Sequence, residues 1–367
     1  MNRVRYFREG EGRSRGGKHG IIRKIEAENG NRMQVDLQLV FPYWMIGAKM
    51  KVGIPRGLLY YEFASMWTTF FDELGIDYII SPKTDKEIYE KGVNYAMHES
   101  CLPLKVLLGH VDFLLGKCDY ILIPRMETLG YYDRMCTRYQ ATIDLVANTF
   151  IDKDLKILPF NINYSEGESE LKAFVKMGKA LGKRKGQAIL AYTKARHVRN
   201  GAIANQEKKM EDQVKTDKVK ILLVGHKYNV FDDFSGSIIL NYLKEMDVEI
   251  LLATDMDGDK ADFYAKELTK TMPWTFNRHL LGAILKFQGK IDGIILISSF
   301  NCGPDSMANE MILRKIKNIP ILNLVIDGQE GVGGMETRLE SFLDIILFKK
   351  EGGLFDRESD LSPNRKL

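Results

Sequence analysis

Short apolar runs alternate with longer amphipathic stretches along most of the chain. Eight of these runs have the length and the apolar content that are typical of buried strands, and they lie at residues 52–55, 78–81, 118–124, 156–158, 219–224, 248–253, 291–297 and 319–325. Most stretches between them repeat their apolar residues with a helical period. Strands that are interleaved with helices indicate parallel sheets. The pattern therefore predicts an α/β fold.

The strand-like runs fall into two groups of four. Between the groups, residues 165–215 have no strand pattern but are rich in Lys, Ala, Glu and Gln with a helical period, which predicts one or two long helices. We therefore expect two Rossmann-like domains whose parallel sheets face a central cleft. The expected organisation is a leader at 1–49, a first domain at 50–162, a helical linker at 163–217, a second domain at 218–349 and a flexible tail at 350–367. We see no strong internal sequence identity between the two domains.

The formal net charge of +4 comes from the start of the chain. Residues 1–50 carry ten Lys or Arg against five Asp or Glu, which leaves 43 basic and 44 acidic side chains in the remainder. A leader rich in Gly and Arg is typical either of an arm that binds nucleic acid or of a segment without fixed structure. Because Met50 directly precedes a clear first strand, we favour the second interpretation, with Met50 as an alternative start, and we expect no nucleic-acid partner.

The sequence also excludes several classes of protein. No apolar run has the length of a membrane span, and no secretory signal pattern opens the chain. None of the four cysteines is in C-x-x-C spacing, which suits a reducing compartment. The absence of H-E-x-x-H and P-loop motifs argues against a zinc hydrolase or a P-loop nucleotidase. We expect a cytoplasmic protein that does not bind a membrane.

Three cysteines stand where a loop leads into a helix. Cys302 comes shortly after the run at 291–297, and Cys136 lies past the run at 118–124. Cys101 and Cys302 are each followed within two residues by a proline, which suits the first turn of a helix, where amide dipoles favour an anionic thiolate. Thiolates are soft ligands for iron. The three settings indicate an iron–sulfur site rather than disulfides, although a buried structural thiol is the alternative for each cysteine taken alone.

Other candidate residues have less specific settings. Cys118 lies inside or just before its strand, where we expect a buried packing thiol. His98 and Glu99 precede Cys101 and are candidates for an acid/base pair or for groups that support a ligand. His226 follows the first strand of the second domain, at the edge where open α/β sheets bind ligands.

Several segments together resemble a known family. They lie at residues 51–57, 98–105, 109–110, 119–125, 225–229, 302–306 and 337–342, and the similarity covers about residues 50–347. The most specific is the Cys-Gly-Pro-Asp-Ser segment at 302–306. The chain resembles the 2-hydroxyacyl-CoA dehydratase/benzoyl-CoA reductase superfamily, and most of all the domain of unknown function related to the acyl-CoA dehydratase activases.

The resemblance implies a cubane 4Fe–4S cluster held by three cysteines from both Rossmann-like domains, which would be Cys101, Cys136 and Cys302 in this chain. A larger double-cubane cluster is the alternative. Members of the family are anaerobic proteins that pass single low-potential electrons to a CoA thioester and create a ketyl radical. They receive the electron from a partner ATPase, an activator with its own iron–sulfur cluster. A homodimer is compatible with the resemblance.

Three hypotheses account for these residues. The favoured one is an iron–sulfur protein related to 2-hydroxyacyl-CoA dehydratase components, which transfers low-potential electrons or dehydrates or reduces a CoA thioester, with His98 and Glu99 as candidate catalytic residues. The second is a non-catalytic iron–sulfur scaffold, carrier or redox sensor that binds the activator-type ATPase. The third is a metal-free α/β binding module with buried thiols. The sequence leaves open whether the chain is itself an enzyme.

Overall fold

The computed structural model describes residues 50–130, 133–328 and 332–350. All of them belong to one compact unit. The predicted leader at 1–49 and residues 351–367 of the predicted tail lie outside the described residues.

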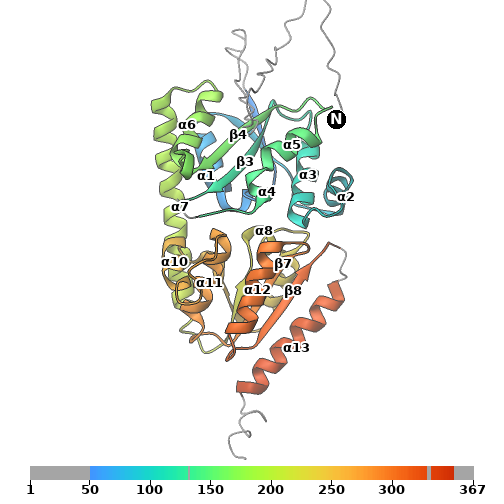
Figure 1. Cartoon of the computed structure of the whole chain (residues 1–367), viewed down its shortest axis with the longest axis vertical. Coiled ribbons are helices and arrows are strands. Elements are labelled where there is room, and N and C mark those ends of the chain that lie inside the picture. The colour runs from blue at the N-terminus through green and yellow to red at the C-terminus, as the bar shows by residue number, and fades with distance from the viewer. Residues whose placement is uncertain (1–49, 131–132, 329–331, 351–367) are drawn as a thin grey trace, which may run out of the picture. The chain divides into compact units, whose positions relative to one another are not determined.

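Two parallel four-stranded sheets form the framework of this unit (Figure 1). The first has the order β2-β1-β3-β4 and consists of β1 (Lys51–Ile54), β2 (Asp77–Ile80), β3 (Tyr120–Thr128) and β4 (Ile157–Asn163). The second has the order β6-β5-β7-β8 and consists of β5 (Val219–Val224), β6 (Val248–Leu252), β7 (Gly293–Ser299) and β8 (Ile321–Ile326). The eight predicted strands are present, and the prediction of an α/β fold with two Rossmann-like sheets is confirmed.

Helices connect successive strands in both halves of the unit. The first half contains α1 (Tyr60–Leu74), α2 (Lys86–Tyr95), α3 (Leu102–Leu114), α4 (Thr137–Gln140) and α5 (Thr142–Thr149). The second half contains α8 (Lys227–Val230), α9 (Gly236–Glu245), the short 3-10 helix η3 (Ala253–Asp255), α10 (Gly258–Ala265), α11 (Thr275–Phe287), α12 (Gly303–Lys315) and α13 (Val332–Lys350). Between the halves, a 3-10 turn (Tyr164–Glu166) precedes α6 (Glu170–Ala180) and α7 (Lys185–Gln213), which are the helices predicted there.

The third strand is longer than predicted. β3 continues past Pro124, because β1 is only four residues long and leaves the later part of β3 with a partner strand on one side, where a proline is tolerated. The stretch after β3 forms two helices, α4 and α5, which meet at Ala141. The hydroxyl of Thr142 donates to the carbonyl oxygen of Arg138 (2.7 Å), a side-chain bond that bends helices.

Helix α7 runs along both halves (Figure 1). Near its start, Ala188, Ala191 and Ala195 are buried where α7 packs on α1 of the first half. Near its end, Met210 belongs to an apolar core of the second half. The helix predicted to join the two halves therefore packs on both of them.

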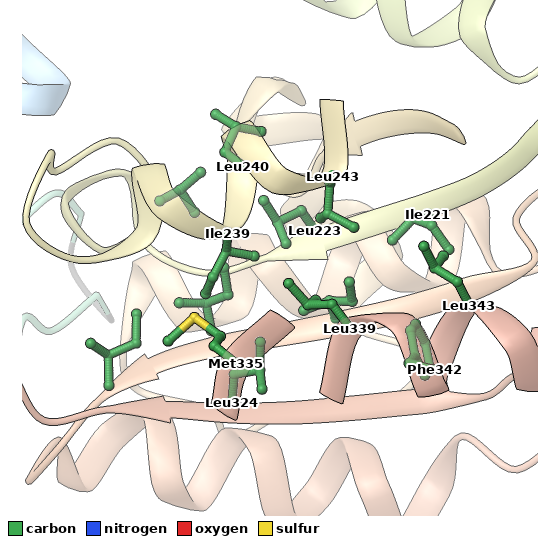
Figure 2. Close-up of a cluster of buried hydrophobic side chains, with 14 of the residues drawn as sticks. Ile221, Leu223, Ile239, Leu240, Leu243, Leu324, Met335, Leu339, Phe342 and Leu343 are labelled. Carbon is green, nitrogen blue, oxygen red and sulfur yellow. The ribbon is translucent and has the colours of Figure 1, made fainter. Parts of the chain in front are cut away.

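Strand β7 is buried on both faces of the second sheet. Ile295 and Ile297 belong to a cluster that α9 and α13 complete, part of which is shown in Figure 2. Ile294 and Leu296 belong to a cluster on the other face, which α10, α11 and α12 complete. A strand that helices cover on both faces is apolar at successive positions, which is why this strand could be predicted from the sequence.

The two halves share a short sequence repeat, so the expectation of no strong internal identity was wrong for this segment. Residues 107–123 align without a gap with residues 280–296, and seven aligned positions are identical. These positions are Leu107, Leu108, Gly109, Gly116, Lys117, Asp119 and Ile121, which match Leu280, Leu281, Gly282, Gly289, Lys290, Asp292 and Ile294. Each segment contains most of the helix before the third strand of its sheet, the turn and the start of that strand.

The repeated aspartate joins the third strand of each sheet to the first. Oδ2 of Asp119 accepts a hydrogen bond from the backbone N–H of Lys51 in β1 (2.7 Å). Oδ2 of Asp292 accepts one from the backbone N–H of Lys220 in β5 (2.7 Å). The aspartate therefore fixes the amino ends of the central strands in the same way in both halves.

The repeated glycine lets two helices of one crossover approach closely. A Cβ atom on Gly109 in α3 would come within 1.9 Å of the carbonyl oxygen of Ile88 in α2. A Cβ atom on Gly282 in α11 would come equally close, 1.9 Å, to the carbonyl oxygen of Ala261 in α10. Only a residue without a side chain permits this spacing.

Candidate functional site

The three candidate cysteines each stand directly before a helix. Cys101 is at the N-cap position of α3, Cys136 at that of α4 and Cys302 at that of α12, all with extended backbone conformations. Pro103 and Pro304 lie in the first turns of α3 and α12, as predicted. Cys136 follows β3 and Cys302 follows β7, so these two cysteines occupy equivalent places in the two halves.

Contacts between the halves bring the loops of these cysteines together. The backbone N–H of Leu102 donates to the carbonyl oxygen of Phe300 (3.2 Å), which joins the start of α3 to the loop that carries Cys302. Cys136 and Cys302 line one small cavity of about 20 Å³. Burial raises the pKa of both thiols, and a charge on Cys101 is close enough to raise both further. Thiols from both halves therefore meet at the carboxyl ends of the two sheets.

In this arrangement the thiols are protonated at neutral pH. Burial raises the pKa of all three, to about 11 for Cys136. Backbone N–H groups in the first helical turns act in the opposite direction, as that of Leu104 does for Cys101 and that of Asp305 for Cys302. The amides alone therefore do not offset burial.

A buried hydrogen-bonded group lies beside Cys302. Oδ1 of Asp305 accepts hydrogen bonds from Nε2 of His226 (2.8 Å) and from Nδ2 of Asn277 (2.8 Å). Burial alone would raise the pKa of Asp305 and lower that of His226, but their attraction for each other outweighs burial and reverses both shifts. After burial, the Asp305 carboxylate is the largest cause of the raised pKa of Cys302. His226 was predicted from the sequence, but Asp305 and Asn277 were not; an aspartate three residues after a helix-capping cysteine was the available signal.

Aromatic side chains form much of the wall of the small cavity. The imidazole of His226 stacks on Tyr228 with ring centroids 5.0 Å apart, and Tyr139 and Phe276 also line the space. Trp274 lines it from the N-cap position of α11. In the alignment of the repeats, extended toward the amino terminus, Trp274 is the counterpart of Cys101. After the third strand, both halves have a cysteine, Cys136 and Cys302. Before the helix that leads into the third strand, the first half has Cys101 but the second half has Trp274.

Cys118 packs against its neighbours, as expected, but it is only partly buried and not the buried thiol that was predicted. It lies just before β3, at the end of the strand opposite to Cys136. Its thiol is 3.5 Å from the carbonyl oxygen of Leu114 and fills the space beside Gly53. Its counterpart in the second half is Ile291, a buried apolar residue.

His98 and Glu99 are exposed in the loop that precedes Cys101. The backbone carbonyl oxygen of Glu99 accepts a hydrogen bond from Nδ2 of Asn301 (3.2 Å), so this loop contacts the second half next to Cys302. The catalytic role of His98 and Glu99 stays a prediction.

A second buried network joins the halves. Oδ2 of Asp232, in the second half, accepts hydrogen bonds from the hydroxyl groups of Tyr61 (2.9 Å) and Thr84 in the first half. Thr84 also contacts Nε2 of His110, which lies fully buried on α3 (2.9 Å). Burial, with the Arg56 guanidinium nearby, lowers the pKa of His110 to about 3, so this histidine is neutral.

A larger cavity of about 410 Å³ adjoins the thiol site, and we call it the interdomain cavity. His226 and Phe276 line both spaces. The wall contains residues at or just after the carboxyl ends of β3, β5 and β6 together with residues of α1, α7 and α11, which is where open α/β sheets bind ligands. Its polar and charged lining residues include Glu62, Glu170, Arg199, His226, Lys227 and Thr254.

The thiol site has the donor chemistry of an iron site but little free space. Within the described ranges, no group of three or more His, Cys, Asp or Glu side chains is arranged to hold a metal ion. Three soft thiols at helix N-termini, beside aromatic rings, nonetheless suit an iron–sulfur cluster. The cavity that Cys136 and Cys302 line, about 20 Å³, holds about one water molecule. The loops that carry the cysteines must therefore move apart to admit a cluster.

Comparisons with known proteins give one family. Residues 51–256 match the family model described as CoA enzyme activase uncharacterised domain. The matched part includes Cys101 and Cys136 but ends before Cys302. No curated protein matches the chain. Among the helices that the structure describes, none combines the length and the apolar character that crossing a membrane requires.

Solved structures resemble this chain only weakly. The SBP FpvC from Pseudomonas aeruginosa in complex with Ni²⁺ is 9% identical, with 84% of this chain and 99% of that chain covered and a TM-score of 0.28. The C-terminal domain of glucosamine-fructose-6-phosphate aminotransferase from Francisella tularensis is 10% identical, with 81% and 84% covered and a TM-score of 0.23. Similarity at this level supports no conclusion about function.

Proposed function

Because the chain belongs to the CoA enzyme activase uncharacterised domain family, we propose that it is an iron–sulfur protein that transfers low-potential electrons or dehydrates or reduces a CoA thioester. Cys101, Cys136 and Cys302 hold a 4Fe–4S cluster between the two halves, and the interdomain cavity takes the thioester. The observation that carries this proposal is the meeting of thiols from both halves beside that cavity.

Backbone amides and Asp305 both favour the binding of iron by the cysteines. A cation between the thiols offsets the burial that raises their pKa, and the N–H groups of the first helical turns then stabilise the thiolates. Asp305 fixes the first turn of α12 against His226 and Asn277, and so orients Cys302. When bound, the cluster supplies single low-potential electrons and, because three thiols leave one iron without a protein ligand, a Lewis acid.

The description of the family also supports an activator as partner. We propose that an ATPase with its own iron–sulfur cluster delivers the electron. Met97 and Phe300 are large apolar side chains that are 66% and 61% exposed, in the loops beside Cys101 and Cys302. If the ATPase bound over these loops, its iron–sulfur cluster would lie close to the thiols and could donate the electron.

Iron analysis with matched cysteine variants tests the proposal. The full chain, purified and reconstituted without oxygen, should contain iron and acid-labile sulfide. Cys101→Ser, Cys136→Ser and Cys302→Ser should each lose most of both, whereas Cys118→Ser should retain them. A wild-type chain without iron, or a Cys118→Ser variant that loses as much iron as the other three, would contradict the proposal.

Binding of a CoA thioester then separates the remaining hypotheses. A chain that binds both iron and the thioester is a component of the dehydration or reduction system. A chain that binds iron but no thioester is a non-catalytic scaffold, carrier or redox sensor. A chain that binds the thioester without iron is a metal-free binding module.

A further inference from the structure

Four helices begin at the thiol site, and three of them have a cysteine at the N-cap position. These cysteines are Cys101 before α3, Cys136 before α4 and Cys302 before α12. The fourth helix, α11, has Trp274 at its N-cap position, and Trp274 lines the small cavity together with Cys136 and Cys302. All four N-cap residues are half-buried. The thiol site therefore has a fourth N-cap residue, which is not a cysteine.

One hydrogen bond between the halves lies beside Cys101 and Cys302. The backbone N–H of Leu102 donates to the carbonyl oxygen of Phe300 (3.2 Å). The donor directly follows Cys101 in the first half, and the acceptor lies two residues before Cys302 in the second half. This bond fixes the start of α3 against the loop that leads into α12.

A second hydrogen bond joins the halves beside Trp274 and Cys136 in the same way. The backbone N–H of Thr275 donates to the carbonyl oxygen of Arg134 (3.2 Å). The donor directly follows Trp274 in the second half, and the acceptor lies two residues before Cys136 in the first half. The two bonds are reciprocal, as in a contact with two-fold symmetry. The four N-cap residues therefore have an approximate two-fold relation, in which Trp274 takes the place of Cys101.

The chemistry of the fourth position differs from that of the other three. A cubane cluster that is fully held by protein has a ligand for each of its four irons. The indole of Trp274 has an N–H donor but no lone pair that could bind a metal. An iron that faces this position therefore has no protein ligand.

We propose that Trp274 occupies the fourth ligand position of the thiol site and leaves the iron on its side free for an external ligand. This inference rests on the proposed function, because it requires the cluster that Cys101, Cys136 and Cys302 hold. The aromatic rings of Tyr139 and Phe276 line the same small cavity. The external ligand is therefore a small donor molecule, or the exposed donor atom of a larger one.

Oxidation of the reconstituted full chain tests the fourth position. Ferricyanide takes an electron from a cubane cluster, and an iron without a protein ligand then leaves as Fe²⁺, so that a 3Fe–4S cluster with its own EPR signal remains. The wild type should give this signal and lose iron. Trp274→Cys should keep its iron and give no such signal, because a fourth thiolate holds the iron.

Phe276→Cys is the matched control, because Phe276 also lines the small cavity but is not one of the four N-cap residues. It should lose iron on oxidation as the wild type does. Trp274→His is a second variant, which keeps a ring at this position in case the cysteine lowers stability. Imidazole binds iron in some clusters, so this variant should also keep its iron and should show a nitrogen coupling in pulsed EPR spectra.

Cyanide tests whether the free iron takes an external ligand. It should change the EPR spectrum of the reduced wild type and of reduced Phe276→Cys, but not that of reduced Trp274→Cys. An unchanged wild-type spectrum would mean that no iron is free, and would overturn the proposal.

The oxidation experiment separates failure of this inference from failure of the proposed function. If Trp274→Cys and Trp274→His fold but lose iron as the wild type does, position 274 is not the fourth ligand position. If the wild type keeps all its iron, the protein already supplies a fourth ligand. If Phe276→Cys also keeps its iron, any thiol in the cavity suffices. Each of these results overturns the inference and leaves the cluster in place, whereas a wild-type chain that binds no iron contradicts the proposed function and this inference together.

Discussion

The two halves of the molecule are alike at the amino ends of their central strands and differ at the carboxyl ends. At the amino ends, Asp119 and Asp292 make the same hydrogen bond to the first strand of their own sheet. At the carboxyl ends, Cys101 in the first half has Trp274 as its counterpart. The comparison teaches that the repeated residues hold each sheet together, whereas most residues of the candidate site are not repeated.

The difference between the two ends of the strands explains why the site lies at the carboxyl ends. In a parallel sheet, the loops at the carboxyl ends can change without disturbing the strands or the helix packing, and these loops supply most ligand contacts in α/β proteins. The repeated Gly109 and Gly282 contribute to packing between helices and lie outside both cavities. Substitutions of these glycines should therefore lower the stability of the fold in both halves.

The largest effect is expected from Gly109→Ala and Gly282→Ala. Each adds a Cβ atom 1.9 Å from a backbone oxygen of the neighbouring helix, so the two helices must separate. We expect each variant to lower the free energy of unfolding by about 3 kcal/mol or more, measured by denaturant titration.

Gly201→Ala is the control for these two variants. It lies in the middle of α7, where an added Cβ atom meets nothing within 4 Å, and it should raise stability by about 0.5–1 kcal/mol. A large loss for only one of Gly109→Ala and Gly282→Ala would show that the repeat does not have the same structural role in both halves.

The next effect concerns the repeated aspartates. Asp119→Ala and Asp292→Ala each leave a backbone N–H at the start of a central strand without its carboxylate partner. We expect a loss of about 1.5–3 kcal/mol for each. Asp292→Ala should lose more, because its hydrogen bond is part-buried and that of Asp119 is exposed. The reverse order in thermal unfolding would mean that burial does not decide the strength of this bond.

Within the repeat, a buried ionisable group distinguishes the halves, since His110 has Ala283 as its counterpart. The pKa of folded His110 is lowered to about 3, below the value of an unfolded histidine, so the unfolded state binds the proton first as the pH falls. The contribution of neutral His110 to stability is present above about pH 6.5 and is lost toward acid, with about 1.5 kcal/mol lost between pH 6.5 and pH 5.

His110→Ala, which places the residue of the second half in the first, should remove this part of the pH dependence even if it also lowers stability at pH 7. The measurement is the free energy of unfolding in urea at pH 7, 6 and 5 for both proteins. Parallel curves for the wild type and the variant would mean that His110 accepts a proton in the folded state.

The division between the two ends also explains what the sequence could predict. Strands such as β7 are apolar on both faces and were recognisable as continuous runs. Pro103 and Pro304 marked the helices that follow Cys101 and Cys302. The repeat is hard to recognise in the sequence because its identical residues are spread over a helix, a turn and a strand instead of forming one run.

The groups around the thiols were harder to predict. Asp305 is 79 residues from His226 and 28 from Asn277, and no periodic pattern connects residues that meet only through tertiary packing. Local patterns predicted the elements, and the contacts between elements determined the site.

The smallest effect is expected from Cys118→Ala, which tests whether this thiol belongs to the packed amino end of β3. The thiol fills the space beside Gly53 and lies 3.5 Å from the carbonyl oxygen of Leu114, in the place where the second half has the apolar Ile291. Removing one sulfur atom from this position should lower the free energy of unfolding by about 1 kcal/mol and leave the iron content of reconstituted protein unchanged. A loss of iron, with or without a loss of stability, would instead place Cys118 among the ligands and contradict the separation of packing residues from site residues between the two ends of the sheets.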